Sequence, residues 1–302
     1  SMKLMTLCLA SAVTLTAGLT IGTRKVTDQP NFLVIVLDDW GVDKFDTYAN
    51  STARTPVLDL VASAGLRLTR AYSDPVCSPS RSAALTGTLG IHTGVTSIFP
   101  WTDTAPDTWV LDPSLYGTLP EVLKQHGYAT AAIGKWHLTA SNWQPDPYLY
   151  PIEFGFDIHM GPITNLLESE GWNYYEYPYN VTTEQGHVQM ASAGEYATTR
   201  QVDDALNWIA GQGGNPWFCW LAFNAPHQPW DVPPLDLITV PVSSLISDGK
   251  KYDAVLEAVD AEIGRLLSSI RPAVFANTTV IIIGDNGTPG AALDFEAPPA
   301  KG

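Results

Sequence analysis

The sequence is poor in the residue types that mark several large classes of protein. Its 302 residues include three cysteines, too few for a disulfide framework. Lysine and arginine together number 16 against 31 acidic residues, which gives a formal net charge of −15. Nucleic-acid binding needs clustered basic side chains, so the composition argues against nucleic acid as a partner. It does not exclude a small anionic ligand, because net charge says little about one local pocket.

Extended apolar runs are scarce, and the one that stands out lies at the N-terminus. Residues 4–21 form a largely apolar run rich in Leu, Ala and Thr, with Lys3 before it and Arg24 and Lys25 after it. This pattern predicts a signal peptide or other targeting segment over residues 1–25, and therefore an exported protein, whether secreted, periplasmic or lysosome-like. The alternative, a membrane anchor, is less favoured because the run is shorter than an ideal membrane span.

Four shorter apolar runs predict the core of the fold. They are residues 32–37, 129–133, 217–223 and 280–283. Each run is nearly continuous rather than alternating, as is typical of strands covered on both faces. Helical patterns fall between them, at residues 56–64, 119–125 and 252–270. Strands that alternate with helices predict an α/β fold, with a mostly parallel central sheet sandwiched by helices.

The region 141–199 has a different composition, rich in Pro, Gly, Tyr, Trp and Asn. We expect long loops with short elements there, which could face a substrate or form an ordinary surface insertion. Trp143, Trp172, Tyr174 and Tyr175 could stack on an aryl or sugar ring or pack in a core.

Polar side chains follow each of the four predicted strands. They are Asp38 and Asp39 after the first strand, Lys135 and His137 after the second, Asn224 and His227 after the third, and Asp285 and Asn286 after the fourth. In open parallel sheets, ligands bind beyond the carboxyl ends of the strands, so these groups should converge. The acidic and amide oxygens suit Ca²⁺ or Mg²⁺ rather than zinc. The alternative is a set of unrelated turns, in which Asp and Asn are common.

The segment Cys77-Ser78-Pro79-Ser80-Arg81 predicts an anion site. Pro79 suits the first turn of a helix, so Cys77 should lie at or just before a helix N-terminus. Unpaired amides and the helix dipole favour an anion there, and Arg81 should project from the same face. Cys77 is therefore a candidate nucleophile, although a cysteine in such a segment can also be a small structural residue.

These segments resemble the signature motifs of the type I, formylglycine-dependent sulfatases, arylsulfatase-like members of the alkaline phosphatase superfamily. Residues 77–81 with 86–87 are similar to the first motif, and residues 127–137 to the second. Further matching segments are residues 31–40, 55–59, 65–72, 225–227 and 284–287. The resemblance implies an alkaline-phosphatase-like fold and a sulfatase catalytic domain over residues 30–302.

The resemblance also implies a cofactor and a modified residue. A formylglycine-generating enzyme would oxidise Cys77 to formylglycine. A Ca²⁺ ion, with Mg²⁺ as the alternative, would be held by Asp38, Asp39, Cys77, Asp285 and Asn286.

The catalytic residues that the resemblance implies are Cys77, Arg81, Lys135, His137, His227 and Lys301. One hydroxyl of the hydrated formylglycine would attack sulfur, helped by Asp285, to give a covalent sulfo-enzyme. Arg81 and Lys135 would position the diol and neutralise charge. His227 and Lys301, together with Lys135, would bind the sulfate, and the first two would protonate the leaving oxygen. His137 would take the proton from the second hydroxyl, so that sulfate leaves.

The chain also departs from the family pattern. A Glu-Gly-Gly stretch normally follows the active-site lysine, but the sequence ends at Gly302 directly after Lys301. We therefore expect a catalytic domain that is truncated at its C-terminus and lacks the smaller C-terminal subdomain. Three hypotheses follow: a hydrolase of small-molecule or carbohydrate sulfate esters, a related phosphonate monoester or phosphodiester hydrolase, and an inactive sulfatase-like fragment.

Overall fold

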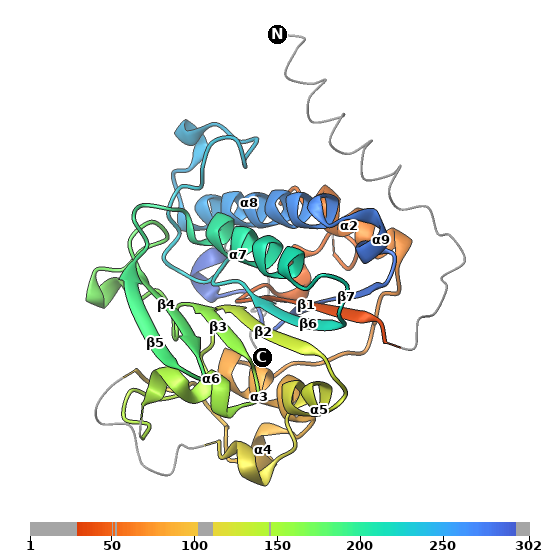
Figure 1. Cartoon of the computed structure of the whole chain (residues 1–302). Helices are drawn as coiled ribbons and strands as arrows, with labels where there is room; N and C mark the ends of the chain where they lie inside the picture. Colours follow the sequence, from red (N-terminus) through yellow and green to blue (C-terminus); the bar gives the residue numbers. More distant parts are fainter. Residues whose placement is uncertain (1–28, 50, 52, 102–110, 145, 294–302) are drawn as a thin grey trace.

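The computed structural model describes residues 29–49, 51, 53–101, 111–144 and 146–293 (Figure 1). The predicted targeting segment over residues 1–25 and the candidate Lys301 lie outside these residues. Across the described part of the chain, no helix combines the length and the apolar character that crossing a bilayer requires.

A seven-stranded sheet forms the centre of the molecule, with the order β5-β4-β3-β2-β6-β1-β7. The strands are β1 (Asn31–Leu37), β2 (Ala129–Gly134), β3 (Ile158–Gly161), β4 (Pro178–Thr183), β5 (Gly186–Ala191), β6 (Trp217–Ala222) and β7 (Thr278–Gly284). The pairings from β3 through β2, β6 and β1 to β7 are parallel, and β4 and β5 pair antiparallel. The prediction of a mostly parallel sheet is confirmed.

Helices cover both faces of the sheet, as Figure 1 shows. One layer contains α2 (Pro56–Ala64), α7 (Ala197–Gly211), α8 (Asp248–Ser269) and α9 (Pro272–Phe275). The opposite layer contains α3 (Cys77–Thr86), α4 (Gly90–Thr93), α5 (Leu119–Gln125) and α6 (Tyr150–Glu153). Single 3₁₀ turns punctuate the loops, at η1 (Val42–Lys44), η2 (Pro113–Leu115), η3 (Pro147–Leu149), η4 (Glu168–Glu170), η5 (Val242–Ser244) and η6 (Gly290–Ala292).

The central strands are continuously apolar because each face supplies its own core. Leu33, Ile35 and Leu37 of β1 pack into the cluster under α7 and α8. Val34 and Val36, on the alternate positions, pack into the cluster on the opposite face. β6 divides in the same way, since side chains along a strand alternate between the two faces. A strand buried on both faces therefore needs apolar side chains at successive positions rather than at alternate ones.

The helices predicted at residues 56–64 and 119–125 are present with those bounds. The third begins earlier than predicted, at Asp248, because the Ser247 hydroxyl accepts a hydrogen bond from the Lys250 amide and caps it. The short elements expected over residues 141–199 are present and include β3, β4 and β5, which extend the sheet in a way that the sequence does not predict. These strands are short or half-exposed, so they lack the continuous apolar run that marks β1 and β6.

Candidate active site

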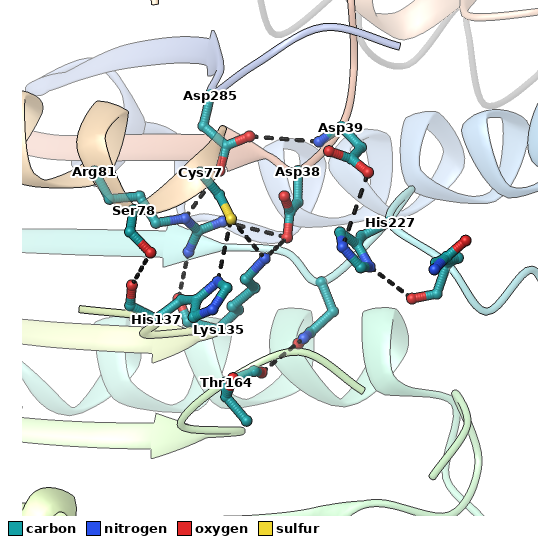
Figure 2. A network of polar contacts seen from close by, with 12 residues as sticks. Asp38, Asp39, Cys77, Ser78, Arg81, Lys135, His137, Thr164, His227 and Asp285 are labelled. Carbon is teal, nitrogen blue, oxygen red and sulfur yellow. Dashed lines mark hydrogen bonds and ion pairs between the residues drawn. The ribbon is translucent and has the colours of Figure 1, made fainter. Parts of the chain in front are cut away.

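The polar residues predicted at the strand ends converge on one edge of the sheet (Figure 2). The four strands that carry them are neighbours, in the order β2-β6-β1-β7, and all run parallel. Most of the group is buried, together with Cys77 and Arg81 of α3. The residues with exposed fractions of 5% or less are Asp38, Asp39, Cys77, Arg81, Lys135, His137, Asn224, Asp285 and Asn286. His227 is half-buried. The charges therefore act on one another with little screening by water.

Two of these residues have a backbone conformation that is unusual for a side chain with a Cβ. Asp39 has a φ of 63° and His137 a φ of 57°, both in the left-handed region. Each turns the chain sharply where its strand ends and so brings its side chain into the site. The hydroxyl of Tyr252, on α8, donates to the Asp39 carbonyl at 2.6 Å.

Cys77 lies at the start of α3, as the sequence predicts. Its Sγ is 3.1 Å from His137 Nδ1 and 3.5 Å from Lys135 Nζ (Figure 2). Burial raises the pKa of the Cys77 thiol to about 11, the nearby Lys135 opposing this. An unmodified Cys77 is therefore protonated at neutral pH and a weak nucleophile, because the thiolate is the reactive form.

Two buried cations neutralise the carboxylates of the site. Arg81 donates from Nε to Asp285 at 2.9 Å and from a terminal nitrogen to the Lys135 carbonyl at 2.6 Å. Lys135 Nζ forms an ion pair with Asp38. Although burial opposes it, Lys135, His227 and Arg81 hold the pKa of Asp38 well below its usual range. Burial, together with the charge of Asp38, raises the pKa of Asp285 to about 7.

The two histidines have different surroundings. Burial, followed by the charges of Lys135 and Arg81, lowers the pKa of His137 well below its usual value, so its ring is neutral. His227 Nε2 lies 3.9 Å from a carboxylate oxygen of Asp39, and its backbone carbonyl accepts the Tyr174 hydroxyl at 2.7 Å. A neutral imidazole can accept a proton, so His137 has the form that a general base requires.

The donor set fits a hard cation. Within the described residues, no three His, Cys, Asp or Glu side chains form a ready metal cluster, since Asp38 faces Lys135 and Asp285 faces Arg81. Two buried oxygens of the site, Asp38 Oδ1 and Asn286 Oδ1, nevertheless have no hydrogen-bond partner in the described structure. Carboxylate and amide oxygens are the ligands that Ca²⁺ prefers. The residues present are therefore suited to Ca²⁺.

Sequence reasoning missed the hydrogen bonds that support the site. Ser78 and Phe99 bond to His137, Tyr252 bonds to the Asp39 carbonyl, and Tyr174 bonds to the His227 carbonyl. Tyr252 falls only within the helical pattern predicted at residues 252–270, and nothing in the sequence marks Phe99. Among the aromatic candidates, Trp143 packs on Tyr150, and Tyr174 and Tyr175 pack on Tyr196, so these three serve the core. Trp172 lines an open cavity of about 880 Å³ between residues 171 and 194.

Comparisons with known proteins agree with this geometry. The sequence profile described as "Sulfatase" matches residues 30–298. N-acetylgalactosamine-6-sulfatase from Homo sapiens is 31% identical over 290 residues, which cover 88% of this chain and 52% of that protein. Arylsulfatase from Hemicentrotus pulcherrimus is 31% identical over 278 residues, covering 86% of this chain and 47% of that protein. The chain thus spans about half the length of these relatives.

Solved structures show the same architecture. The crystal structure of Ps i-CgsB aligns with a TM-score of 0.73 at 25% identity, over 89% of this chain and 61% of that one. The structure of yidJ from Bacteroides fragilis aligns with a TM-score of 0.71 at 25% identity, over 88% of this chain and 64% of that one. The α/β arrangement described above is therefore shared with longer chains.

Proposed function

The chain belongs to the sulfatase family of hydrolases, within the alkaline phosphatase superfamily, and on that premise we propose that it hydrolyses sulfate esters with formylglycine derived from Cys77. The observation that carries the proposal is the position of Cys77, at a helix start with its Sγ 3.1 Å from the His137 imidazole and 3.5 Å from the Lys135 ammonium. A base and a fixed cation thus both lie close to the side chain at position 77, which would be the nucleophile.

The buried cations explain how a sulfuryl group would be bound. Its oxygens carry spread negative charge, which fixed positive groups stabilise without reorganising. Lys135 and His227 would bind the sulfate, with Lys301 from outside the described residues. Arg81 would support the site indirectly, by holding Asp285 and the Lys135 carbonyl in place.

His137 and His227 would move the protons. His137 is neutral and has Nδ1 beside position 77, so it would take a proton there. His227 is half-buried near Asp39 and would protonate the oxygen of the departing alcohol. Formylglycine, once formed and hydrated, would supply the hydroxyl that attacks sulfur and would later allow sulfate to leave.

Oxygens of Asp38, Asp39, Asp285 and Asn286 would hold Ca²⁺, with the modified position 77 as a further ligand. The bound ion would polarise the sulfuryl oxygens as a Lewis acid. Because this chain is similar to an N-acetylgalactosamine-6-sulfatase, we propose a sulfated carbohydrate as the substrate class and a formylglycine-generating enzyme as the maturation partner. Export through residues 1–25 also stays a prediction.

The test is sulfate release by the chain after co-expression with a formylglycine-generating enzyme, with calcium present. We expect turnover of p-nitrophenyl sulfate and of galactosamine 6-sulfate, and loss of both in Cys77→Ala. Cys219→Ala is the matched control, because Cys219 is also buried but lies within β6, away from the site. Faster turnover of a phosphodiester would favour the related phosphate-ester activity. No release, with the aldehyde present by mass spectrometry, would contradict the proposal for this chain.

A further inference from the structure

Three hydrogen bonds join Ser78, Phe99 and His137 in a closed ring. The Ser78 hydroxyl donates to the His137 carbonyl at 2.8 Å. The Phe99 amide donates to the same hydroxyl at 3.1 Å. The third bond, of 3.2 Å, joins His137 Nε2 to the Phe99 carbonyl. Ser78, Phe99 and His137 are 0%, 3% and 2% exposed, so water does not compete for these bonds.

The direction of each bond in the ring is fixed by chemistry. A backbone carbonyl can only accept and a backbone amide can only donate. Ser78 therefore donates to His137 and accepts from Phe99, which leaves no choice for its hydrogen. The Phe99 carbonyl must likewise receive a hydrogen from His137 Nε2. In a neutral imidazole only one nitrogen carries hydrogen, so Nδ1 presents a lone pair. Nδ1 is the nitrogen that faces Cys77.

The same three hydrogen bonds hold His137 in a strained backbone conformation. His137 has a φ of 57°, and a side chain with a Cβ adopts this region at a cost. Its amide donates to the Ile163 carbonyl at 2.9 Å, and its carbonyl receives the Ser78 hydroxyl. Both ends of the residue are thus fastened, one of them by the residue that follows the candidate nucleophile.

We propose that Ser78 and the Phe99 backbone are positioning groups that fix His137 as the Nε2–H tautomer, with Nδ1 as the base toward position 77. The inference rests on the proposed function for its role in turnover, but the tautomer itself does not. The Phe99 carbonyl orients the His137 imidazole and places its hydrogen on Nε2. Ser78 holds Phe99 by its amide and His137 by its carbonyl, so one side chain controls both partners.

The first test reads the tautomer directly in the unmodified chain. Two-bond ¹H–¹⁵N correlation spectra of ¹⁵N-histidine-labelled protein distinguish protonated from unprotonated ring nitrogens. The chain has 6 histidines, and loss of one set of peaks in His137→Gln assigns the residue. We expect hydrogen on Nε2 and none on Nδ1. A hydrogen on Nδ1 in this spectrum overturns the proposal, whether or not the protein has sulfatase activity.

The second test removes the hydroxyl. Ser78→Ala should give a mixed tautomer spectrum and lower kcat about ten-fold or more with little change in KM, because the base is misplaced while sulfate binding is kept. Ser78→Thr keeps a hydroxyl and should restore most of kcat. Ser82→Ala is the matched control, a buried serine of the same helix whose hydroxyl contacts Thr93 instead. Formylglycine content is measured by mass spectrometry for each variant.

The outcomes separate this inference from the proposed function. A Ser78→Ala protein with the parent spectrum and parent kcat overturns the positioning role. If the parent chain releases no sulfate, the proposed function fails while the spectrum still decides the tautomer. If Ser78→Ala does not fold, the spectrum of the parent chain and the kcat of Ser78→Thr decide between the outcomes. A kcat of Ser78→Thr close to that of the parent supports the positioning role of the Ser78 hydroxyl. A loss of kcat equal to that of His137→Gln overturns it.

Discussion

The side chains of Arg81 and Asp285 form a buried ion pair, so the stability of the fold should depend strongly on keeping both or neither. Arg81 Nε lies 2.9 Å from the Asp285 carboxylate, and both side chains are at most 1% exposed. Removing one partner of a buried pair leaves an uncompensated charge and costs about 3–5 kcal/mol. Arg81→Met and Asp285→Asn should each lose stability on that scale. The double variant leaves neither charge, so we expect it to lose about 2 kcal/mol less than the sum of the single losses.

Urea unfolding followed by circular dichroism measures the four free energies of this cycle. A calcium chelator is included, because a bound cation would compensate the carboxylates. The matched control is Arg265→Met with Asp203→Asn, a pair at 2.6 Å whose side chains are 36% and 49% exposed. Exposed pairs contribute about 0–1 kcal/mol, so its coupling should be small. Free energies that add within about 0.5 kcal/mol for the buried pair would refute the reasoning.

Three further predictions concern the pH dependence of stability, calcium binding and the hydrogen bond from Tyr252 to the Asp39 carbonyl. Burial raises the pKa of Asp260 from 3.8 to about 7, so the folded protein keeps a proton that the unfolded chain loses. Stability should therefore fall by about 3 kcal/mol from this group as pH rises from 5 to 8, and Asp260→Asn should lack that fall in urea midpoints. Calcium at about a hundred times its Kd should stabilise the chain by about 2.7 kcal/mol in thermal melts, and Asn286→Ala should shrink this gain; an equal gain would exclude Asn286 as a ligand. Tyr252→Phe should cost about 1 kcal/mol in stability and lower sulfate release, because the bond from its hydroxyl to the Asp39 carbonyl is lost; unchanged release would confine that bond to stability.

The central strands could be predicted from sequence because they are buried on both faces. β1 and β6 show this as unbroken apolar runs, and β2 is buried in the same way. β7 could be predicted from its apolar run alone, because it lies at the sheet edge and is only partly buried. β4 and β5 could not be found in this way, because β5 lies at the sheet edge and four of its six residues are exposed. An edge strand is determined by its pairing partner more than by its own composition.

The residues that make up the site could also be predicted, but not which acidic side chain pairs with which basic one. Polar residues after parallel strands must meet at one edge, which a sequence can show. Which carboxylate faces which cation depends on contacts between residues 97 and 204 positions apart, as for Lys135 with Asp38 and Arg81 with Asp285. A converging set of acids read from sequence looks like a metal site alone. The fold shows that two of those acids also bind the buried cations.

The two left-handed residues explain why both helix layers matter to the site. Of the three non-glycine residues with positive φ in the described chain, Asp39 and His137 lie just beyond β1 and β2, at the same edge of the sheet. A glycine would relieve the strain at either position, but it would remove the carboxylate or the imidazole. The strain therefore has to be held from outside the strand. Tyr252 holds Asp39 from the α8 layer, and Ser78 holds His137 from the α3 layer on the opposite face. A shift of either layer against the sheet would move one of the two groups and not the other, so the distance between them depends on the whole sandwich rather than on the strand ends alone.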